Sequence, residues 1–225
     1  MAASSPIVFL FDVDNTLLDN DRVTADLGGY LDQHFGAEAR KEYFANFESL
    51  RRELGYADYL GALQRYRNGH PRNVRLLSLS AFLIDYPFAD RRYPRALDGL
   101  KKCRASYTTA ILSDGDVVFQ PRKVRRSGIH EAVDGNVMIY IHKELELDDV
   151  EQRYPAEHYV FVDDKPRLVK AIKKYWGDRV TTVLPRQGHY AAEIGPNDPP
   201  PADIMIDRIG DFSVDEITRA ALRPD

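Results

Sequence analysis

A run of five apolar residues, Ile7 to Phe11, leads directly into two carboxylates, Asp12 and Asp14. A run that is apolar at every position and rich in Val, Ile and Phe is typical of a strand buried on both faces of a sheet. Side chains alternate along a strand, so these two carboxylates point the same way if the strand geometry persists that far. At least one of them then has a raised pKa unless a cation joins them. For an isolated pair of this kind, a polar turn that merely closes a strand is the alternative.

Two later stretches repeat the design of an apolar strand that ends in polar or acidic residues. The strand expected over 107–113 ends at Ser113, and the strand expected over 158–163 leads into Asp163 and Asp164. In a parallel sheet, ligands bind beyond the carboxyl ends of the strands, so the three strands predict one shared acidic pocket. That many carboxylates need a cation, and an all-oxygen set without Cys or His suits Mg²⁺ rather than zinc.

The rest of the chain divides into a helical segment and an alternation of strands and helices. From Asp19 to about Arg92, aromatic and aliphatic residues recur at steps of three and four, which indicates a set of core-forming helices. Further strands are expected over 137–141, 180–184 and 204–206, and a loop is expected over 195–201. The pattern predicts an α/β fold, a doubly wound parallel sheet interrupted after its first strand by an all-helical segment.

Composition limits the classes of function. The 225 residues are 44% hydrophobic and 29% charged, which is ordinary for a soluble protein, and the net charge of −4 gives no sign of nucleic-acid binding. The single cysteine excludes an internal disulfide, and no apolar run approaches the roughly 20 residues that span a bilayer. The first six residues lack the features of a signal peptide. We therefore expect a cytoplasmic protein without a nucleic-acid or membrane partner, as a monomer or a homodimer.

One basic run, Arg122 to Arg126, contains four basic residues among five. Such a run can mark a nucleic-acid patch. In an acidic chain we expect it instead to form the solvated face of a helix.

In the order of their motifs, these residues resemble the haloacid dehalogenase (HAD) superfamily. The stretch from Asp12 to Thr16 matches its DxDxT motif, and Ser113 closes an apolar strand as the second-motif Ser or Thr does. Lys143 lies where the third-motif Lys is expected, and Asp163-Asp164 matches the acidic fourth motif. The resemblance implies a Rossmann-like core over 1–18 and 93–225, with the helical segment 19–92 as a cap.

The resemblance also implies a role for each motif residue. Asp12 is the expected nucleophile, and Asp14 the expected general acid and base. Lys143 would offset negative charge, with Lys123 and Lys165 as competing candidates because no Pro follows Lys143. The residues expected to bind the phosphoryl group, with the first two also holding the nucleophile, are Thr16, Ser113 and Asp114, the last standing where Asn is frequent.

The cofactor that the resemblance implies is Mg²⁺. Its expected ligands are Asp12, the backbone carbonyl of Asp14, and Asp164, with Asp163 acting through water. Dehalogenases of the family lack an acid two residues after the nucleophile, so Asp14 favours a phosphatase for a small phosphorylated metabolite. One or two of the arginines of the helical segment could reach the substrate's anionic groups. The alternatives are a haloacid dehalogenase, phosphonatase or phosphomutase, and a non-catalytic HAD-like binding module.

Overall fold

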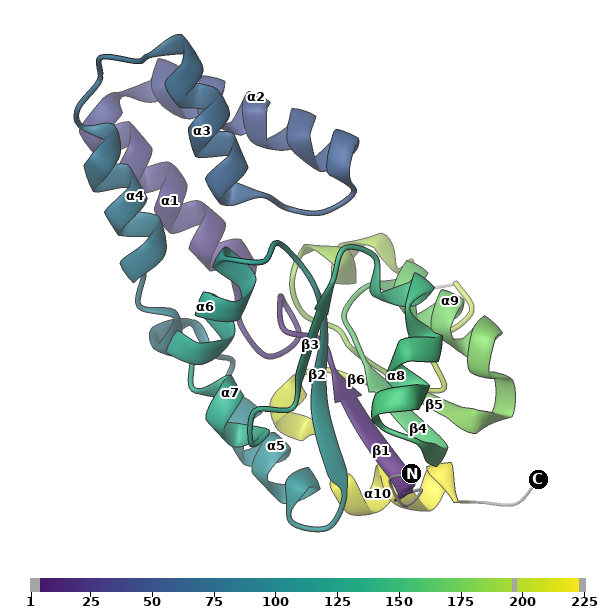
Figure 1. Ribbon diagram of the computed structural model, residues 1–225. Helices are drawn as coiled ribbons and strands as arrows, with labels where there is room; N and C mark the ends of the chain where they lie inside the picture. Colours follow the sequence, from purple (N-terminus) through teal and green to yellow (C-terminus); the bar gives the residue numbers. More distant parts are fainter. Residues whose placement is uncertain (1–4, 196–197, 223–225) are drawn as a thin grey trace.

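The computed structural model describes residues 5–195 and 198–222, and within them six parallel strands form a single sheet (Figure 1). In chain order the strands are β1 (Ser5–Phe11), β2 (Thr108–Asp114), β3 (Val137–Tyr140), β4 (Ala156–Val162), β5 (Val180–Pro185) and β6 (Ile204–Ile206). Their order in the sheet is β3-β2-β1-β4-β5-β6, so β1 lies between β2 and β4. The predicted doubly wound α/β sheet is confirmed. The predicted loop over 195–201 falls partly on residues 196–197, which lie outside the described residues.

Both faces of the sheet are buried, which explains why its central strands are apolar at every position. Ile7, Phe9 and Phe11 of β1 pack on one face, and Val8 and Leu10 pack on the other. The first face is covered by helices that include α5 (Ala96–Arg104) and α10 (Val214–Ala221), and the second by α8 (Leu147–Arg153) and α9 (Pro166–Trp176). On the second face, the Trp176 ring stacks on Tyr159 with their centroids 4.3 Å apart.

Four helices follow β1 in the chain before α5: α1 (Asn20–Phe35), α2 (Ala37–Leu54), α3 (Tyr59–Gly69) and α4 (Leu76–Asp85). In Figure 1 they stand together beyond the carboxyl ends of the strands. They lie within the segment 19–92 for which a cap was predicted. The assignment of the chain to two domains stays a prediction, and its outermost residues 1–4 and 223–225 lie outside the described residues.

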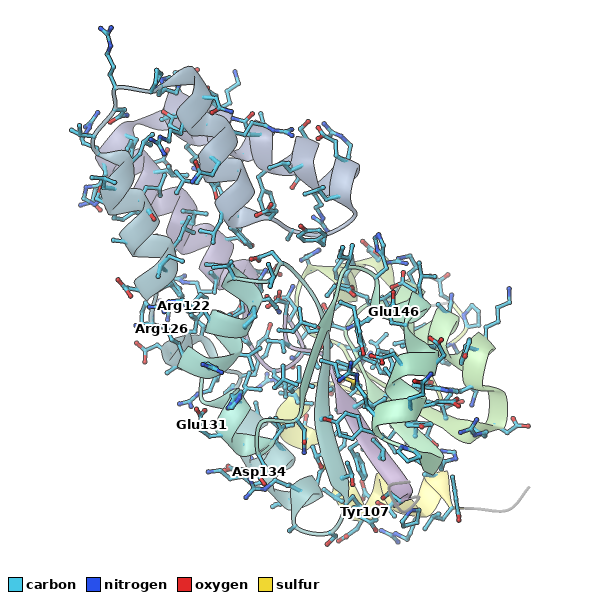
Figure 2. The ribbon with its side chains drawn as sticks, viewed as in Figure 1. Tyr107, Arg122, Arg126, Glu131, Asp134 and Glu146 are labelled. Atoms are coloured by element: carbon cyan, nitrogen blue, oxygen red, sulfur yellow. The ribbon has the colours of Figure 1, made fainter. Side chains whose placement is uncertain are left out.

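The basic run 122–126 forms the expected solvated face only in part, since Arg125 and Arg126 are exposed but other members are not. It belongs to α6 (Phe119–Arg126), where Lys123 is buried. Arg122 donates to the Ile84 carbonyl and, at 2.9 Å, to the Asp85 carboxylate. Arg126, the other end of the run in Figure 2, donates to the Asp85 carbonyl at 2.9 Å. The two arginines thus bind the carbonyl end of α4, where cations are favoured, and fasten the helical segment to the core.

One short helix completes the connection from α6 to the third strand. After α6 comes α7 (Ile129–Ala132), and single 3-10 turns are found at Phe88–Arg91, Lys143–Leu145, Gly177–Arg179, His189–Glu193 and Ile209–Asp211. Throughout residues 5–195 and 198–222, no helix combines the length and apolar character that crossing a membrane requires.

Candidate active site

A tight turn follows β1 and carries the first motif. The strand ends at Phe11, and the Leu17 and Leu18 amides both donate to the Val13 carbonyl, at 2.9 and 3.0 Å. Asn15 takes a left-handed conformation with φ of 56°, which Asn tolerates better than most residues. Its side-chain oxygen accepts the Asn20 amide at 3.0 Å and so joins the turn to the start of α1.

Asp12 is buried at the end of β1 and is held by a buried lysine. Lys143 Nζ lies 2.6 Å from Asp12 Oδ1, and the Ser113 hydroxyl donates to the same oxygen at 3.4 Å. Burial would raise the pKa of Asp12, but attraction to Lys143 and Lys165 prevails and holds it below the usual value. The carboxylate is therefore ionised, as a nucleophile requires.

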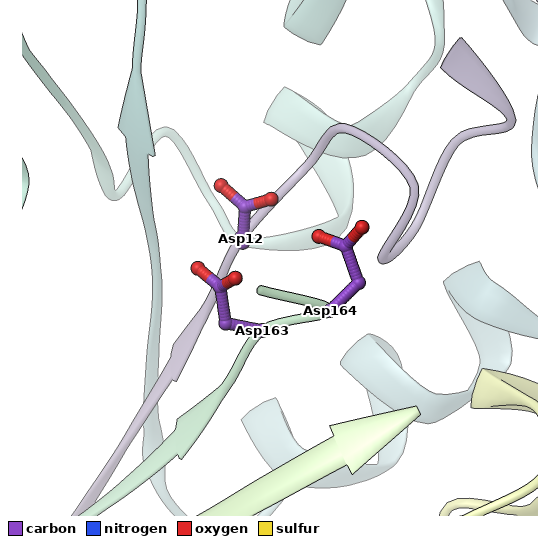
Figure 3. Close-up of side chains that lie close together, drawn as sticks. All are labelled: Asp12, Asp163 and Asp164. Atoms are coloured by element: carbon purple, nitrogen blue, oxygen red, sulfur yellow. The ribbon is translucent and has the colours of Figure 1, made fainter. Parts of the chain in front are cut away.

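Asp163 and Asp164, at the end of β4, complete a cluster of three buried carboxylates with Asp12 (Figure 3). One oxygen from each lies within 4.8 Å of the others. Burial raises the pKa of Asp163 to about 6 despite the attraction of Lys143. Burial and repulsion from Asp163 and Asp12 raise the pKa of Asp164 as well. Lys143 and Lys165 therefore do not neutralise this cluster fully.

The pairing of the carboxylate oxygens shows where a cation fits. Asp163 Oδ1 accepts the Lys165 amide at 2.7 Å, and its Oδ2 lies 2.6 Å from Lys143 Nζ. Asp163 Oδ2 is paired only through this ion pair, and Asp12 Oδ2 and Asp164 Oδ2 are buried with no hydrogen-bond partner in the described part of the chain. Such groups are costly unless they are paired, and an all-oxygen set suits a hard divalent cation. The residues therefore fit Mg²⁺, with Asp12 and Asp164 offering free oxygens.

Asp14 does not join this cluster, because β1 ends before the second carboxylate. Its two carboxylate oxygens lie 2.7 and 2.9 Å from Nζ of Lys123, a residue of α6 that is 1% exposed. Lys123 also donates to Asn20 Oδ1 at 3.0 Å. The two carboxylates that follow β1 thus have separate cations, Lys143 for Asp12 and Lys123 for Asp14. The Asp14 side chain remains partly exposed, at 22%.

The residues that end β2 hold the site from the other side of β1. The Ser113 hydroxyl accepts from Gln120 Nε2 at 3.0 Å while it donates toward Asp12. Asp114 Oδ1 accepts the Lys143 amide at 2.8 Å and so positions the turn that carries this lysine. Gln120 had no signal in the sequence beyond its place one turn before Lys123 on the same helix.

Thr16 holds a different residue from the one expected. The resemblance predicts that its hydroxyl holds the nucleophile together with Ser113. In the structure this hydroxyl accepts the Asp164 amide at 3.0 Å and lies 3.4 Å from Asp164 Oδ1. Thr16 therefore orients the carboxylate with a free oxygen. The phosphoryl-binding role of Thr16, Ser113 and Asp114 stays a prediction.

The loop after β5 contacts the turn that follows β1 and was missed in the sequence, because it carries no periodic pattern. Gln187 donates to the Asn15 and Thr16 carbonyls at 2.9 and 2.7 Å. His189 Nδ1 lies 2.7 Å from Asp21 of α1. Gly188 packs so closely that a Cβ there would lie 2.6 Å from Asn15 Cβ. A short Gly-containing loop on the edge of a predicted sheet is the signal that was available.

A cavity of about 240 Å³ opens between the helical segment and the core. From the core side its walls include Asp14, Asp114, Gln120, Lys123, Lys165 and Arg167. From the helical segment they include Arg51, Tyr56 and Tyr59. Of the three candidate lysines, Lys143 lies against Asp12 and Asp163, Lys123 lies against Asp14, and Lys165 lines this cavity.

Comparison with solved structures gives close and distant matches. A haloacid dehalogenase-like hydrolase from Burkholderia xenovorans LB400 is 61% identical, with a TM-score of 0.85, over 92% of this chain and 96% of that one. HAD-hydrolase YfnB from Bacillus subtilis, solved bound to magnesium, is 15% identical, with a TM-score of 0.61, over 96% of this chain and 98% of that one. L-2-haloacid dehalogenase from Xanthobacter autotrophicus is 18% identical, with a TM-score of 0.60, over 94% of this chain and 98% of that one.

The two distant matches show a shared fold only. No protein-family model matches the chain, and no curated protein matches it. The Burkholderia protein, by contrast, is similar over nearly its whole length, and the DxDxT turn and acidic pair of this chain lie at the strand ends where the resemblance expects them. The chain belongs to the haloacid dehalogenase superfamily of hydrolases.

Proposed function

We propose that the protein is a Mg²⁺-dependent phosphomonoesterase that forms an aspartyl-phosphate at Asp12. The observation that carries the proposal is the cluster at the ends of β1 and β4. It has two buried carboxylate oxygens without a partner in the described chain, on Asp12 and Asp164. Asp14 supports phosphatase chemistry as a second acidic group at the cavity.

In the proposed first half-reaction, an Asp12 carboxylate oxygen attacks the phosphorus atom. A bond forms between that oxygen and phosphorus, the bond from phosphorus to the leaving oxygen breaks, and Asp14 protonates that leaving oxygen. Lys143 offsets charge on the nucleophile and the phosphoryl group, and the Ser113 hydroxyl orients Asp12. Positioning and charge neutralisation are the main sources of catalysis in phosphoryl transfer.

In the second half-reaction, Asp14 takes a proton from a water molecule. The water oxygen attacks phosphorus, the bond from phosphorus to Asp12 breaks, and inorganic phosphate leaves. Asp12, Asp164 and the Asp14 carbonyl would hold Mg²⁺, with Asp163 contributing through water. Bound there, the ion supplies positive charge for the phosphoryl oxygens.

A haloacid dehalogenase activity is the competing proposal within the family. The structure of the Xanthobacter dehalogenase contains covalently bound chloropropionic acid, but at 18% identity the likeness extends to the fold alone. An acidic cluster that needs a cation favours the phosphatase, because a metal-free dehalogenase has no use for it.

The test is hydrolysis of p-nitrophenyl phosphate by the wild-type protein with Mg²⁺ and with EDTA, and by Asp12→Asn with Mg²⁺. We expect activity that needs the metal and is lost in Asp12→Asn, because the amide is neutral and a poor nucleophile. Asp98→Asn is the matched control, since Asp98 is exposed on α5. It should keep wild-type activity.

Release of chloride from L-2-chloropropionate is measured in parallel. Chloride release that persists in EDTA, without hydrolysis of the phosphate ester, would overturn the phosphatase proposal and support a dehalogenase. Phosphatase activity that survives Asp12→Asn would overturn the mechanism. The protein is a binding module if three results are found together: neither substrate reacts, neither substrate shows Mg²⁺-dependent binding, and no phosphate ester of a metabolite screen is hydrolysed.

A further inference from the structure

Two arginines line the cavity, Arg51 from the helical segment and Arg167 from the core. Arg51 lies in the last turn of α2 and reaches across to the core, where it donates to the Tyr190 hydroxyl at 2.8 Å. Arg167, near the start of α9, lines the same cavity. The α2–α3 loop approaches the core closely as well, because a Cβ at Gly55 would lie 2.2 Å from the His142 ring. Arg51 is therefore held at the cavity by Tyr190, while 42% of its side chain stays exposed.

Arg51 has no short ion pair with a carboxylate in the described chain, in contrast to two other basic residues of the cavity wall. Lys123 lies 2.7 Å from Asp14, and Arg167 lies 2.6 Å from Glu144. The Glu48 carboxylate oxygen Oε1 lies 3.9 Å from Arg51 Nη1, which is at the limit of an ion pair. Its short hydrogen bond goes to the Tyr190 hydroxyl and not to a carboxylate. Arg51 therefore keeps donors and positive charge for a ligand.

Two other arginines of the helical segment, Arg65 and Arg40, are paired with carboxylates. Arg65 makes two contacts of 2.9 Å with the Glu53 carboxylate, and Arg40 lies 2.7 Å from Asp32. The carboxylates on the cavity wall include Asp14, Asp114 and Glu193. Asp14 and Asp114 are bound by Lys123 and by the Lys143 amide, and Glu193 is exposed.

The position of Arg51 at the carbonyl end of α2 has a structural explanation that must be separated from a binding role. Basic residues are favoured in the last turn of any helix. Arg52 occupies the same turn and gains the same benefit, but it does not line the cavity. The neighbouring residue is thus an internal control for charge and helix position.

We propose that the substrate carries a second anionic group, a carboxylate or a phosphate, which binds Arg51 beside Tyr190 and Arg167. The inference rests on the proposed function, because the first anionic group is the phosphoryl group that reacts at Asp12. A cavity of about 240 Å³ has the volume of about eight water molecules. The substrate class is therefore a phosphate ester of a few carbon atoms with an anionic group at its far end.

The test compares three probes that share a three-carbon skeleton. Glycerol 3-phosphate has one anionic group, 3-phosphoglycerate adds a carboxylate, and glycerol 1,3-bisphosphate adds a phosphate. Phosphate release is followed with Mg²⁺, and a probe that is not turned over is measured as a competitive inhibitor of p-nitrophenyl phosphate hydrolysis. We expect the wild-type protein to prefer a two-anion probe over glycerol 3-phosphate by about tenfold or more, since hydrogen bonds to charged groups are among the strong ones.

The variants are Arg51→Gln, Arg51→Lys and the control Arg52→Gln. Arg51→Gln should reduce the preference about tenfold, mainly through KM, and Arg51→Lys should restore part of it. Arg52→Gln should keep the wild-type preference. Preference for 3-phosphoglycerate identifies a carboxylate as the second group, and preference for the bisphosphate identifies a phosphate.

Two results would overturn the inference. The first is that the wild-type protein hydrolyses p-nitrophenyl phosphate but shows no preference among the three probes. This result would reject a binding site for a second anionic group and keep the proposal of a phosphatase. Equal loss of preference in Arg51→Gln and Arg52→Gln assigns the effect to general charge. Failure of the phosphatase itself is recognised separately, by p-nitrophenyl phosphate that stays intact.

Discussion

Lys143 and Lys123 approach the site from different elements and hold different carboxylates. Lys143 is shared between Asp12 and Asp163, whereas Lys123 binds both oxygens of Asp14. Neither lysine forms an ion pair with Asp164 in the described chain, and Asp164 Oδ2 has no hydrogen-bond partner there. The proposed metal therefore meets the carboxylate that the protein's own cations leave least neutralised.

Replacement of Lys123 by methionine tests its pairing with Asp14. The change keeps the apolar stem but removes the ammonium, so Asp14 loses the cation that binds both its oxygens. We expect the free energy of unfolding to fall by about 1–3 kcal/mol, because Asp14 is partly exposed and regains some water. Chemical denaturation gives the value. The double variant with Asp14→Asn should recover part of the loss, and additive losses would contradict a direct pair.

His158 on β4 gives the protein a predicted acid sensitivity. Burial lowers its pKa below the usual 6.5, so the folded state favours the neutral ring. The stability that this ring contributes is present above the unfolded pKa of about 6.5 and is lost as the pH falls through the folded pKa. Denaturation at a series of pH values should show less decline in acid for His158→Gln. The same change at the exposed His34 should leave the slope unaltered, and an unaltered slope in both variants would contradict the assignment.

At the scale of elements, the loop 186–190 joins three parts of the molecule. Gln187 binds the turn that follows β1 and accepts the Ile209 amide at 3.0 Å, His189 binds Asp21 of α1, and Tyr190 accepts from Arg51 of α2. The loop therefore links the position of the helical segment to the turn that carries Asp12.

Replacement of Gln187 by leucine should release this link. Two carbonyls and one amide lose their partner at a nearly buried position, so we expect a loss of about 2–4 kcal/mol in the free energy of unfolding. The kcat for p-nitrophenyl phosphate should fall as well, because the turn is no longer fixed. Gln152→Leu, at an exposed position of α8, is the control. A loss of stability below about 0.5 kcal/mol would show that the loop does not support the turn.

The sequence predicted the elements better than the contacts between them. The strands that end before Asp12 and Asp163 were predictable, because full burial makes them apolar throughout. The separation of Asp14 from Asp12 was not, since it depends on where β1 stops and on Lys123 from a helix far away in the chain. The contacts of Arg122 and Arg126 with the end of α4 were not predictable, because their partners come from another helix whose placement no local pattern reveals.

At the scale of the whole molecule, the acidic cluster links stability to the metal. We expect Mg²⁺ at a hundred times its dissociation constant to add about 2.7 kcal/mol, which for a chain of this size raises Tm by roughly 5–10 °C. Thermal unfolding in Mg²⁺ and in EDTA measures the shift. Without metal, Asp164→Asn should unfold at a higher temperature than the wild-type protein, because it removes a buried charge beside two others.

The same variant should respond little to added Mg²⁺. A Tm that rises with Mg²⁺ as much in Asp164→Asn as in the wild-type protein would place the ion elsewhere. Asp98→Asn controls for the loss of one negative charge and should keep the full shift.

The central place of β1 in the sheet has a consequence for folding during synthesis on the ribosome. Val8 of β1 pairs with Thr108 on one side and with Tyr159 on the other. Because β1 precedes β2 and β4 in the chain, it cannot pair until they have been made. Until they emerge, an apolar strand with two open edges is exposed to other nascent chains. The helical segment is made in the meantime from local contacts, which form quickly. Asp12, the proposed nucleophile, can therefore meet Asp163 and Asp164 only after β4 has been made.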